Sequence, residues 1–377
     1  MRFDRWFGQI DWLLVAASLG LVAIGVLAID TATDSASGTG PVQRQLVWTG
    51  IALVAMAAAA WPSYRLIYSL AYLAFVLCIP LLVAVYWIEP VNGAQRWLRF
   101  GPVGVQPSEL TKLAFVAALA RYLASTEHRW GWRMLFVPFA LAGVPIALIL
   151  RQPDLGSALL FVPVMTAMLF GAGLRTRYWC ILLIAGIVAV PFLWRGMSPF
   201  QRARITSFLE QRDTGPRPND EGYQLHQSKL MIALGGTKGS EDATDLHLPF
   251  DHTDFIFSVV AGRWGLTGVT MILGLFVVLF WRGWRVSSQA PDSFGRLLAM
   301  GLTTLLATQS LVNLAMTIGL APITGLTLPF VSYGGSSLLT SFLAVGILLS
   351  IERQRRATWP ENMIDGVHDY SLAFTAR

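Results

Sequence analysis

The feature that most constrains this chain is the recurrence of apolar stretches close to 20 residues long. A helix that crosses the hydrocarbon core of a bilayer needs roughly 20 predominantly apolar residues. Such stretches recur along the whole sequence, at about 12–30, 46–61, 66–88, 108–124, 133–150, 155–174, 178–194, 254–281, 297–318 and 336–352. The sequence therefore predicts an all-α polytopic membrane protein with about ten transmembrane helices, folded as one transmembrane domain over residues 1–377.

Composition agrees with a membrane protein and argues against other classes. Hydrophobic residues make up 54% of the chain and charged residues 13%, whereas soluble domains average roughly 45–50% and about 25%. The net charge of +6 is divided among short clusters between apolar stretches, so no nucleic-acid-binding face is indicated. Cys78 and Cys180 lie within or at the end of apolar runs, which predicts neither a disulfide framework nor a cysteine metal site.

The arginines between the stretches predict the orientation, because Lys and Arg in short loops concentrate on the cytoplasmic side. With the N-terminus inside, the inner segments carry Arg2, Arg5, Arg65, Arg129, Arg133, Arg175, Arg177, Arg282, Arg285, Arg296, Arg353, Arg355 and Arg356. Both termini are therefore expected to be cytoplasmic, with a C-terminal tail at about 353–377. The basic start also resembles a signal peptide, but the long apolar run to Ile29 and the stretches after it favour a retained first helix.

One connecting segment, at about 195–253 between predicted helices 7 and 8, is far longer than the others and rich in Gly, Pro and charge. Long loops translocate regardless of their charge, so this one is expected to be extracytoplasmic. Arg202, Arg204 and Lys229 offer charge to an anionic ligand, and the glycines of "ALGGTKGSE" offer backbone amides. A loop that is merely solvated is the ordinary alternative.

Charged residues also occur within or at the edges of the apolar stretches. Inserting a charged side chain into a membrane costs about 2.5–3.5 kcal/mol at a helix centre, so each such residue needs a partner or a function. Glu109 and Lys112 are three residues apart, so they share one face of a helix that begins near Pro107 and Ser108. They could line a polar cavity or form a structural ion pair, and both interpretations stay open. Asp154 is expected to cap the following helix, with a substrate contact as the second interpretation.

The stretch "GLAPITGLTLPFVSYGGSS", at 319–337, is too broken for a helix and too apolar for a free loop. Irregular backbone at membrane depth survives only where protein buries it or a water-filled cavity solvates it. We expect a re-entrant or cavity-lining segment. A tight surface turn before the last helix is the alternative.

In "DHTDFIF" three titratable residues, Asp251, His252 and Asp254, stand directly before an apolar run. Partial desolvation would make Asp254 a better base, whereas a helix N-cap would place an acid at the same position. The residues alone do not separate these interpretations. His252 has no second His or Cys at ligand spacing, so it is expected to be a hydrogen-bonding neighbour of Asp254 rather than a zinc ligand.

Six segments together resemble one family, the SEDS proteins (shape, elongation, division and sporulation; the RodA and FtsW group). The segments are "NGAQRWLRFGPVGVQPSELTKLAF", "QPDLGSALL", "QRARITSFL", "GYQLHQSKLMI", "HTDFIFSVV" and "GLTLPFVSYGGSS". They appear in the family's order and span most of the chain. The first looks more like the elongation (RodA) branch than the division branch.

The resemblance implies a peptidoglycan glycosyltransferase of the bacterial cytoplasmic (inner) membrane that polymerises lipid II for cell-wall elongation and cell shape. It implies a class B penicillin-binding protein as partner, and undecaprenyl pyrophosphate as the leaving group. Asp254 matches the family's essential acid and would be the general base on the acceptor's GlcNAc 4-hydroxyl. A divalent cation, Mg²⁺ or Mn²⁺, is left open as a cofactor. The substrate-binding candidates are Glu109, Lys112, Arg202, Arg204, Lys229, Asp154 and His252.

The chain departs from the family pattern after this motif, where Gly262 and Arg263 replace acids. Two other functions stay open besides the polymerase. One is a flippase or transporter of a lipid-linked precursor, since ten helices and a charged cavity would serve translocation equally well, although no inverted repeat is visible. The other is a weakly active scaffold for the penicillin-binding protein, for which the two replaced acids are the only support.

Overall fold

The computed structural model describes residues 8–32, 40–88, 96–100, 103–126, 132–174, 221–243, 248 and 252–375, with single positions and short runs between 178 and 209. Helices dominate the described residues. They are α2 (Trp12–Ala32), α3 (Gly40–Ala60), α4 (Arg65–Ala84), η1 (Val85–Trp87), α5 (Pro107–Ser125), α6 (Trp132–Arg151), α7 (Leu155–Gly171), α10 (Glu221–Gly235), α11 (Ile256–Ser288), α12 (Ser293–Thr317) and α13 (Gly335–Thr375).

Six of these helical segments are long and apolar enough to cross a membrane: Trp12–Ala32, Gly40–Ala60, Arg65–Trp87, Ile256–Ser288, Ser293–Thr317 and Gly335–Ala357. Two shorter apolar segments lie at Leu135–Arg151 and Leu155–Gly171. The mostly helical, multi-pass character that the apolar stretches predicted is confirmed. The predicted span at 178–194 falls largely outside the described residues.

Two elements were not expected from the sequence. The all-α prediction misses a small antiparallel hairpin, β1 (Leu98–Phe100) and β2 (Val103–Val105), which pairs Leu98 with Val105 just before α5. The predicted loop at 195–253 contains α10, a whole helix that packs against α11. The loop is therefore in part an ordered element of the bundle.

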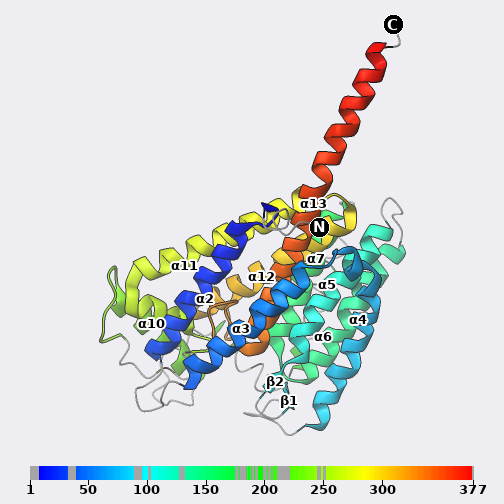
Figure 1. The fold of residues 1–377 in the computed structure, drawn as a ribbon. Coiled ribbons are helices and arrows are strands. Elements are labelled where there is room, and N and C mark those ends of the chain that lie inside the picture. The colour runs from blue at the N-terminus through cyan, green and yellow to red at the C-terminus, as the bar shows by residue number, and fades with distance from the viewer. Residues whose placement is uncertain are drawn as a thin grey trace.

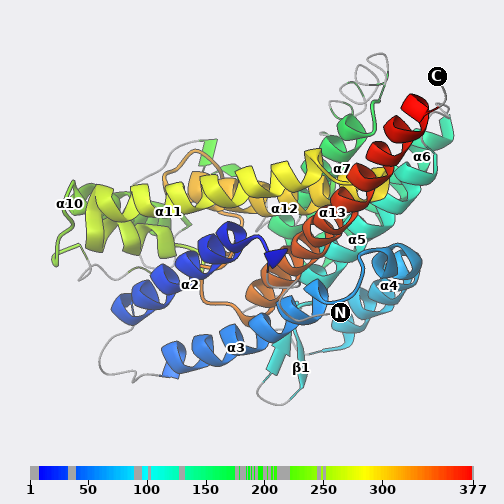
Figure 2. The ribbon, with the colours of Figure 1, turned by 45° about the horizontal axis from the view of Figure 1, so that its top comes forward.

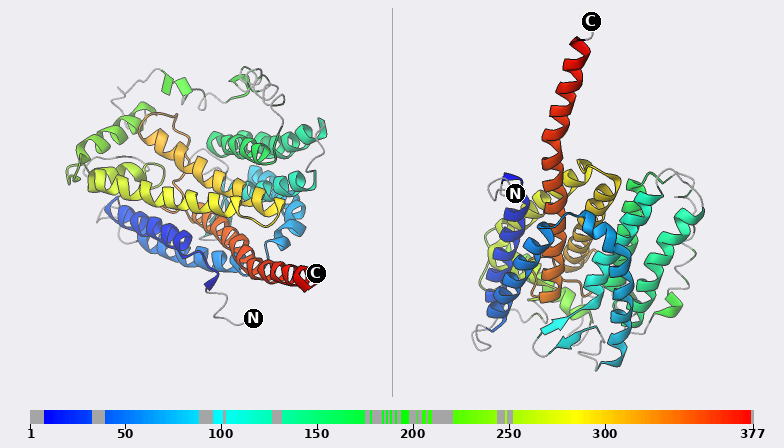
Figure 3. Two further views of the ribbon diagram at one scale, coloured as in Figure 1. Left: turned by 90° about the horizontal axis from the view of Figure 1, so that it is seen from above. Right: turned by 45° about the vertical axis from the view of Figure 1, so that its right-hand side comes forward.

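The helices form two groups with α12 and α13 between them (Figure 1; Figure 2). The first group is α2, α3, α10 and α11, and the second is α4 to α7. Helix α12 packs against α5, α7, α11 and α13, while α13 packs most extensively against α3. The C-terminal part of α13 projects from the bundle (Figure 3). Helix α12 is therefore placed to connect side chains from both groups.

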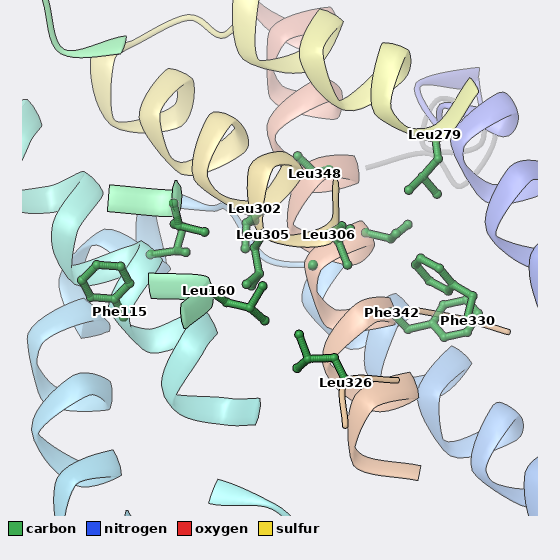
Figure 4. Close-up of a cluster of buried hydrophobic side chains, with 14 of the residues drawn as sticks. Phe115, Leu160, Leu279, Leu302, Leu305, Leu306, Leu326, Phe330, Phe342 and Leu348 are labelled. Atoms are coloured by element: carbon green, nitrogen blue, oxygen red, sulfur yellow. The ribbon is translucent and has the colours of Figure 1, made fainter. Parts of the chain in front are cut away.

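A continuous apolar core lies around α12 and is lined by large side chains from both groups (Figure 4). The rings of Phe330 and Phe342 meet edge to face at 5.2 Å. The contact between α3 and α13 is close because Gly346 has no side chain. Gly346 lies directly against the Met56 carbonyl, and a Cβ added at Gly346 would lie only 2.9 Å from the Ala59 Cβ. The alanine-rich stretch before Trp61 thus serves close helix packing through small side chains.

Helix α11 is interrupted at Gly265, where φ is 58° and ψ is −149°, a conformation essentially restricted to glycine. The interruption lies against the turn that follows α10. The Leu266 N–H donates to the Gly236 carbonyl at 3.0 Å, and the Ser240 N–H donates to the Gly262 carbonyl at 2.9 Å. Because the two backbones touch here, α10 is fixed against the first part of α11.

Candidate functional site

The irregular segment between α12 and α13 begins at the surface, where Leu320 is exposed, and is mostly buried in the protein from Thr324 to Ser332, which we call the buried segment. Leu328, Phe330 and Val331 are at most 1% exposed, and side-chain amides from neighbouring helices bind its carbonyls. Gln309 donates to the Thr327 carbonyl at 3.1 Å, and Gln45 of α3 donates to the Ser332 carbonyl at 3.2 Å; Asn313 also contributes, as described below. The alternative of a tight surface turn is therefore wrong, and irregular backbone survives here because protein buries it and satisfies its polar groups.

The predicted pair Glu109 and Lys112 forms a buried ion pair on the first turns of α5. Lys112 Nζ lies 2.8 Å from Glu109 Oε1 and donates to Gln309 Oε1 at 2.9 Å. The second carboxylate oxygen, Glu109 Oε2, accepts from Thr340 Oγ1 of α13 at 2.9 Å. One charge pair thus joins α5, α12 and α13 beside the buried segment.

Asp154 caps α7, as its position in the sequence predicted. Its carboxylate accepts from the Ser157 N–H at 3.1 Å and from Ser157 Oγ at 2.8 Å. Gln106 Nε2 donates to it at 3.1 Å, and the guanidinium of Arg96 lies 3.9 Å away. The side chain is 3% exposed, so these groups use much of its hydrogen-bonding capacity.

The turn at 252–255 carries Asp254 to the edge of the buried segment. The His252 carbonyl accepts from the Tyr333 N–H at 2.9 Å, and the His252 ring lies 5.7 Å from the Tyr333 ring. The Asp254 carbonyl accepts from Asn313 Nδ2 at 2.8 Å. Helix α11 begins at Ile256 and Phe255 occupies the N-cap position, so Asp254 stands one residue outside the position that the capping alternative requires.

The three basic candidates of the long loop have different positions. Lys229 lies on α10 with its Cε and Nζ over Gly319, the first residue after α12 that has a left-handed backbone, at φ 80°. Arg202 donates to the Arg195 carbonyl at 2.8 Å and lies 6.0 Å from the Trp194 ring. Arg204 lies outside the described residues. Of the two basic candidates that the structure describes, Lys229 and Arg202, Lys229 is the one that contacts the segment between α12 and α13.

A hydroxyl cluster places Lys229 near the start of α11. Ser228 and Ser258 are fully buried, and their Oγ atoms lie 2.6 Å apart. Ser228 Oγ also donates to the Thr317 carbonyl at 2.7 Å. Ser258 lies in the first turn of α11, which directly follows the turn that carries Asp254, so Lys229 and Asp254 are held in the same region by neighbouring residues.

Gly235 and Gly239, two of the three glycines of "ALGGTKGSE", serve packing rather than an anion cradle. The Gly239 N–H donates to the Gly235 carbonyl at 2.7 Å, and the Ser240 N–H is bound by α11 as described above. Gly235 and Gly239 lie directly against the carbonyls of Ala261 and Arg263. The expectation that the glycine amides face an anionic ligand is wrong for Gly239, because its N–H already has a backbone acceptor.

Gly262 and Arg263, which stand where the family pattern has acids, both lie at the contact between α10 and α11. An added Cβ at Gly262 would lie 2.8 Å from Met231 Cγ and 3.2 Å from Ala243 Cβ, so the site is too tight for a long side chain. Arg263 is 3.3 Å from Glu241 on the turn after α10. Both residues therefore belong to the contact between α10 and α11.

Gln309 and Asn313 are the residues that sequence reasoning missed. They are four residues apart on α12, hence on one face, and they are 3% and 0% exposed. Asn313 Nδ2 donates to both the Leu326 carbonyl, at 2.6 Å, and the Asp254 carbonyl. Two amides at helical spacing within an apolar span were the available signal, since polar side chains inside a membrane seldom lack a role.

The described residues gather no group of three or more His, Cys, Asp or Glu side chains that could hold a metal ion. Divalent cations such as Mg²⁺ prefer carboxylate and other oxygen ligands. The described side chains therefore form no all-protein cage for the divalent cation that the family resemblance left open, although Mg²⁺ is usually held by one or two carboxylates together with substrate phosphates.

Comparison with known proteins gives one consistent result. Residues 9–357 match the model of the cell cycle protein family named for FtsW, RodA and SpoVE. The chain is 37% identical over 359 residues to the probable peptidoglycan glycosyltransferase FtsW of Geobacter sulfurreducens, covering 90% of this chain and 94% of that protein. It is 33% identical over 355 residues to the peptidoglycan glycosyltransferase MrdB of Escherichia coli K12, covering 92% and 95%.

The fold is similar as well. A chain from a solved peptidoglycan synthase complex, described for its coordination of polymerization and crosslinking, superposes with a TM-score of 0.80. The two chains are 33% identical, and the match covers 92% of this chain and 98% of the solved one. Sequence and fold therefore agree over most of the molecule.

Proposed function

Since this chain belongs to the FtsW, RodA and SpoVE family of cell cycle proteins, we propose that it is a glycosyltransferase that polymerises lipid II into peptidoglycan strands. Relatives named as peptidoglycan glycosyltransferases match it over nearly their whole length. The observation that carries the proposal is the position of Asp254, a half-buried acid whose main-chain carbonyl is bound by Asn313 of α12 beside the buried segment.

Asp254 is proposed as the general base. The acceptor's GlcNAc 4-hydroxyl has a pKa far above neutrality, so its attack needs a positioned group that takes the proton. The hydroxyl oxygen forms a bond to the anomeric carbon of the donor, while the bond from that carbon to the pyrophosphate oxygen breaks. The proton passes to the Asp254 carboxylate, and undecaprenyl pyrophosphate leaves with the electron pair.

The departing pyrophosphate needs positive charge or donors near it. Lys229 is the best-supported candidate, because α10 is anchored beside the first turn of α11 through Ser228 and Ser258. Arg202 and Arg204 remain candidates from the same predicted loop. His252, beside the base, and Asp154, at the start of α7, complete the substrate-binding proposal together with Glu109 and Lys112.

The membrane arrangement is part of the proposal. Ten transmembrane helices in a single domain, with both termini cytoplasmic, would place Asp254 and the 195–253 loop on the extracytoplasmic side of the bacterial inner membrane. The alternation of basic segments supports this orientation. A class B penicillin-binding protein is proposed as the partner, by analogy with the synthase complex that the fold resembles.

The branch of the family is a separate proposal. The stretch from Asn92 to Glu109 looks like the elongation branch, so we propose a role in cell elongation and shape. Identities of 37% to an FtsW and 33% to MrdB do not separate the branches. Complementation of elongation-defective and division-defective strains tests it, and rescue of only the division-defective strain would contradict it.

Purified protein with labelled lipid II, alone and with its cognate penicillin-binding protein, tests the function itself. Glycan strands in either reaction support the polymerase. Strands in neither reaction, with lipid II moved between the leaflets of a vesicle, would support the flippase instead. Strands in neither reaction, with a stable complex of the two proteins and no lipid movement, would support the scaffold.

A further inference from the structure

We propose that Asn313 is a positioning residue for the base: its side-chain amide fixes the main chain at Asp254 against the buried segment between α12 and α13. The inference rests on the proposed role of Asp254. It goes beyond that role by assigning a function to a residue on a different helix that does not itself meet the substrate.

The first support is the double hydrogen bond of one amide group. Asn313 Nδ2 donates to the Leu326 carbonyl at 2.6 Å and to the Asp254 carbonyl at 2.8 Å. An amide nitrogen has two hydrogens, so both donors are used. The two carbonyl acceptors also fix the orientation of the Asn313 side-chain amide: its nitrogen must face them, because its oxygen Oδ1 would be repelled by both carbonyl oxygens.

The second support is the buried oxygen of the same amide, Asn313 Oδ1, which has no hydrogen-bond partner among the described residues. Asn313 is 0% exposed. Burying an acceptor that has no hydrogen-bond partner destabilises the folded protein. A residue kept for packing alone would avoid that cost with an apolar side chain, so the two donors are the reason for an asparagine here.

The third support is the position of this bond on the turn at 252–255. The Tyr333 N–H donates to the His252 carbonyl at 2.9 Å, whereas Asn313 binds the carbonyl of Asp254 itself, the residue that carries the carboxylate. Loss of the Asn313 donor would let the main chain at Asp254 shift and move the carboxylate, and displacements near 1 Å can cost about 100-fold in rate.

The experiment compares Asn313→Ala and Asn313→Asp in the full-length protein with its penicillin-binding partner, using labelled lipid II as substrate. Ser310→Ala is the matched control, because Ser310 is equally buried on α12 but donates only within its own helix, to the Leu306 carbonyl at 2.8 Å. We expect kcat to fall about 10- to 100-fold in both Asn313 variants. KM for lipid II should stay within about twofold of wild type, because Asn313 does not contact substrate.

Four results would overturn the inference. The first three are a kcat within twofold of wild type in a folded Asn313 variant, a rise in KM alone, and an equal loss of kcat in Ser310→Ala. The fourth is failure of both Asn313 variants to fold, since the residue would then be purely structural. Asp254→Asn in the same assay separates the two proposals: full activity there removes the base itself, whereas an inactive Asp254→Asn beside an active Asn313→Ala removes only the positioning role.

Discussion

Lys112 Nζ lies 2.8 Å from Glu109 Oε1 inside the helix bundle, and the two side chains are 2% and 7% exposed. The pair also binds α12 through Gln309 and α13 through Thr340. Its position beside the buried segment fits both a site-lining pair and a structural one. A comparison of single and double variants separates these interpretations.

Glu109→Gln and Lys112→Met should each destabilise the protein by about 3–5 kcal/mol, because each leaves one buried charge without its partner. The double variant should recover most of that stability, since neither charge remains. If the pair lines the site, the double variant stays inactive in lipid II polymerisation. Thermal unfolding in detergent and strand synthesis measure the two effects, and an active double variant would make the pair purely structural.

Arg282→Met should destabilise the protein by about 3–5 kcal/mol, because it leaves the buried Asp11 carboxylate unpaired. Arg282 Nε donates to Asp11 Oδ2 at 2.7 Å, and this contact joins α11 to α2. Arg285→Met on the same helix is the control, since Arg285 is exposed. Equal unfolding temperatures for the two variants would show that the ion pair contributes nothing.

Gly262→Glu should lower stability without raising activity. The added side chain would meet Met231 and Ala243, and overpacking typically costs about 1–3 kcal/mol. Gly274→Ala is the control, because nothing lies within 4 Å of a Cβ at Gly274 on the same helix. A Gly262→Glu protein that is more active than wild type would instead mean that the missing acid limits the enzyme.

Tyr64 should make stability depend on pH in the alkaline range. Burial and the hydrogen bond to Asp292, at 2.7 Å, raise the pKa of Tyr64 above its ordinary value. The folded state therefore favours the neutral phenol. The contribution of this phenol to the free energy of unfolding is complete below the pKa of an unfolded tyrosine, about 10, and is lost as the pH rises above it. The stability difference between wild type and Tyr64→Phe should shrink above about pH 10, and a constant difference would contradict this.

Much of the fold follows from local sequence signals. Apolar stretches of spanning length predict helices, because every backbone N–H and C=O group inside a bilayer must be hydrogen-bonded within the protein and few structures other than a helix achieve this. The cap by Asp154 depends on residues three positions apart. The burial of Thr324 to Ser332 follows from a stretch that is too broken to span and too apolar to be free. Each of these properties is decided within a few residues.

What the sequence did not predict depends on packing between distant residues. The bond from Asn313 to Asp254 joins residues 59 positions apart, and no local pattern specifies such a pair. Helix α10 was missed because its polar sequence lacks a long apolar run. The glycines near Gly239 were misjudged because open loop amides and packed ones look alike until the partner helix is known.

The polymerisation rate of Asp254→Asn, measured with labelled lipid II and the penicillin-binding partner, tests the central claim most directly. Asp242→Asn is the matched control, because Asp242 is an exposed aspartate on the turn after α10. General-base catalysis typically contributes about 10²–10⁴-fold, so the rate of Asp254→Asn should fall by about that factor while Asp242→Asn keeps the wild-type rate. Equal rates for wild type and Asp254→Asn would contradict the account.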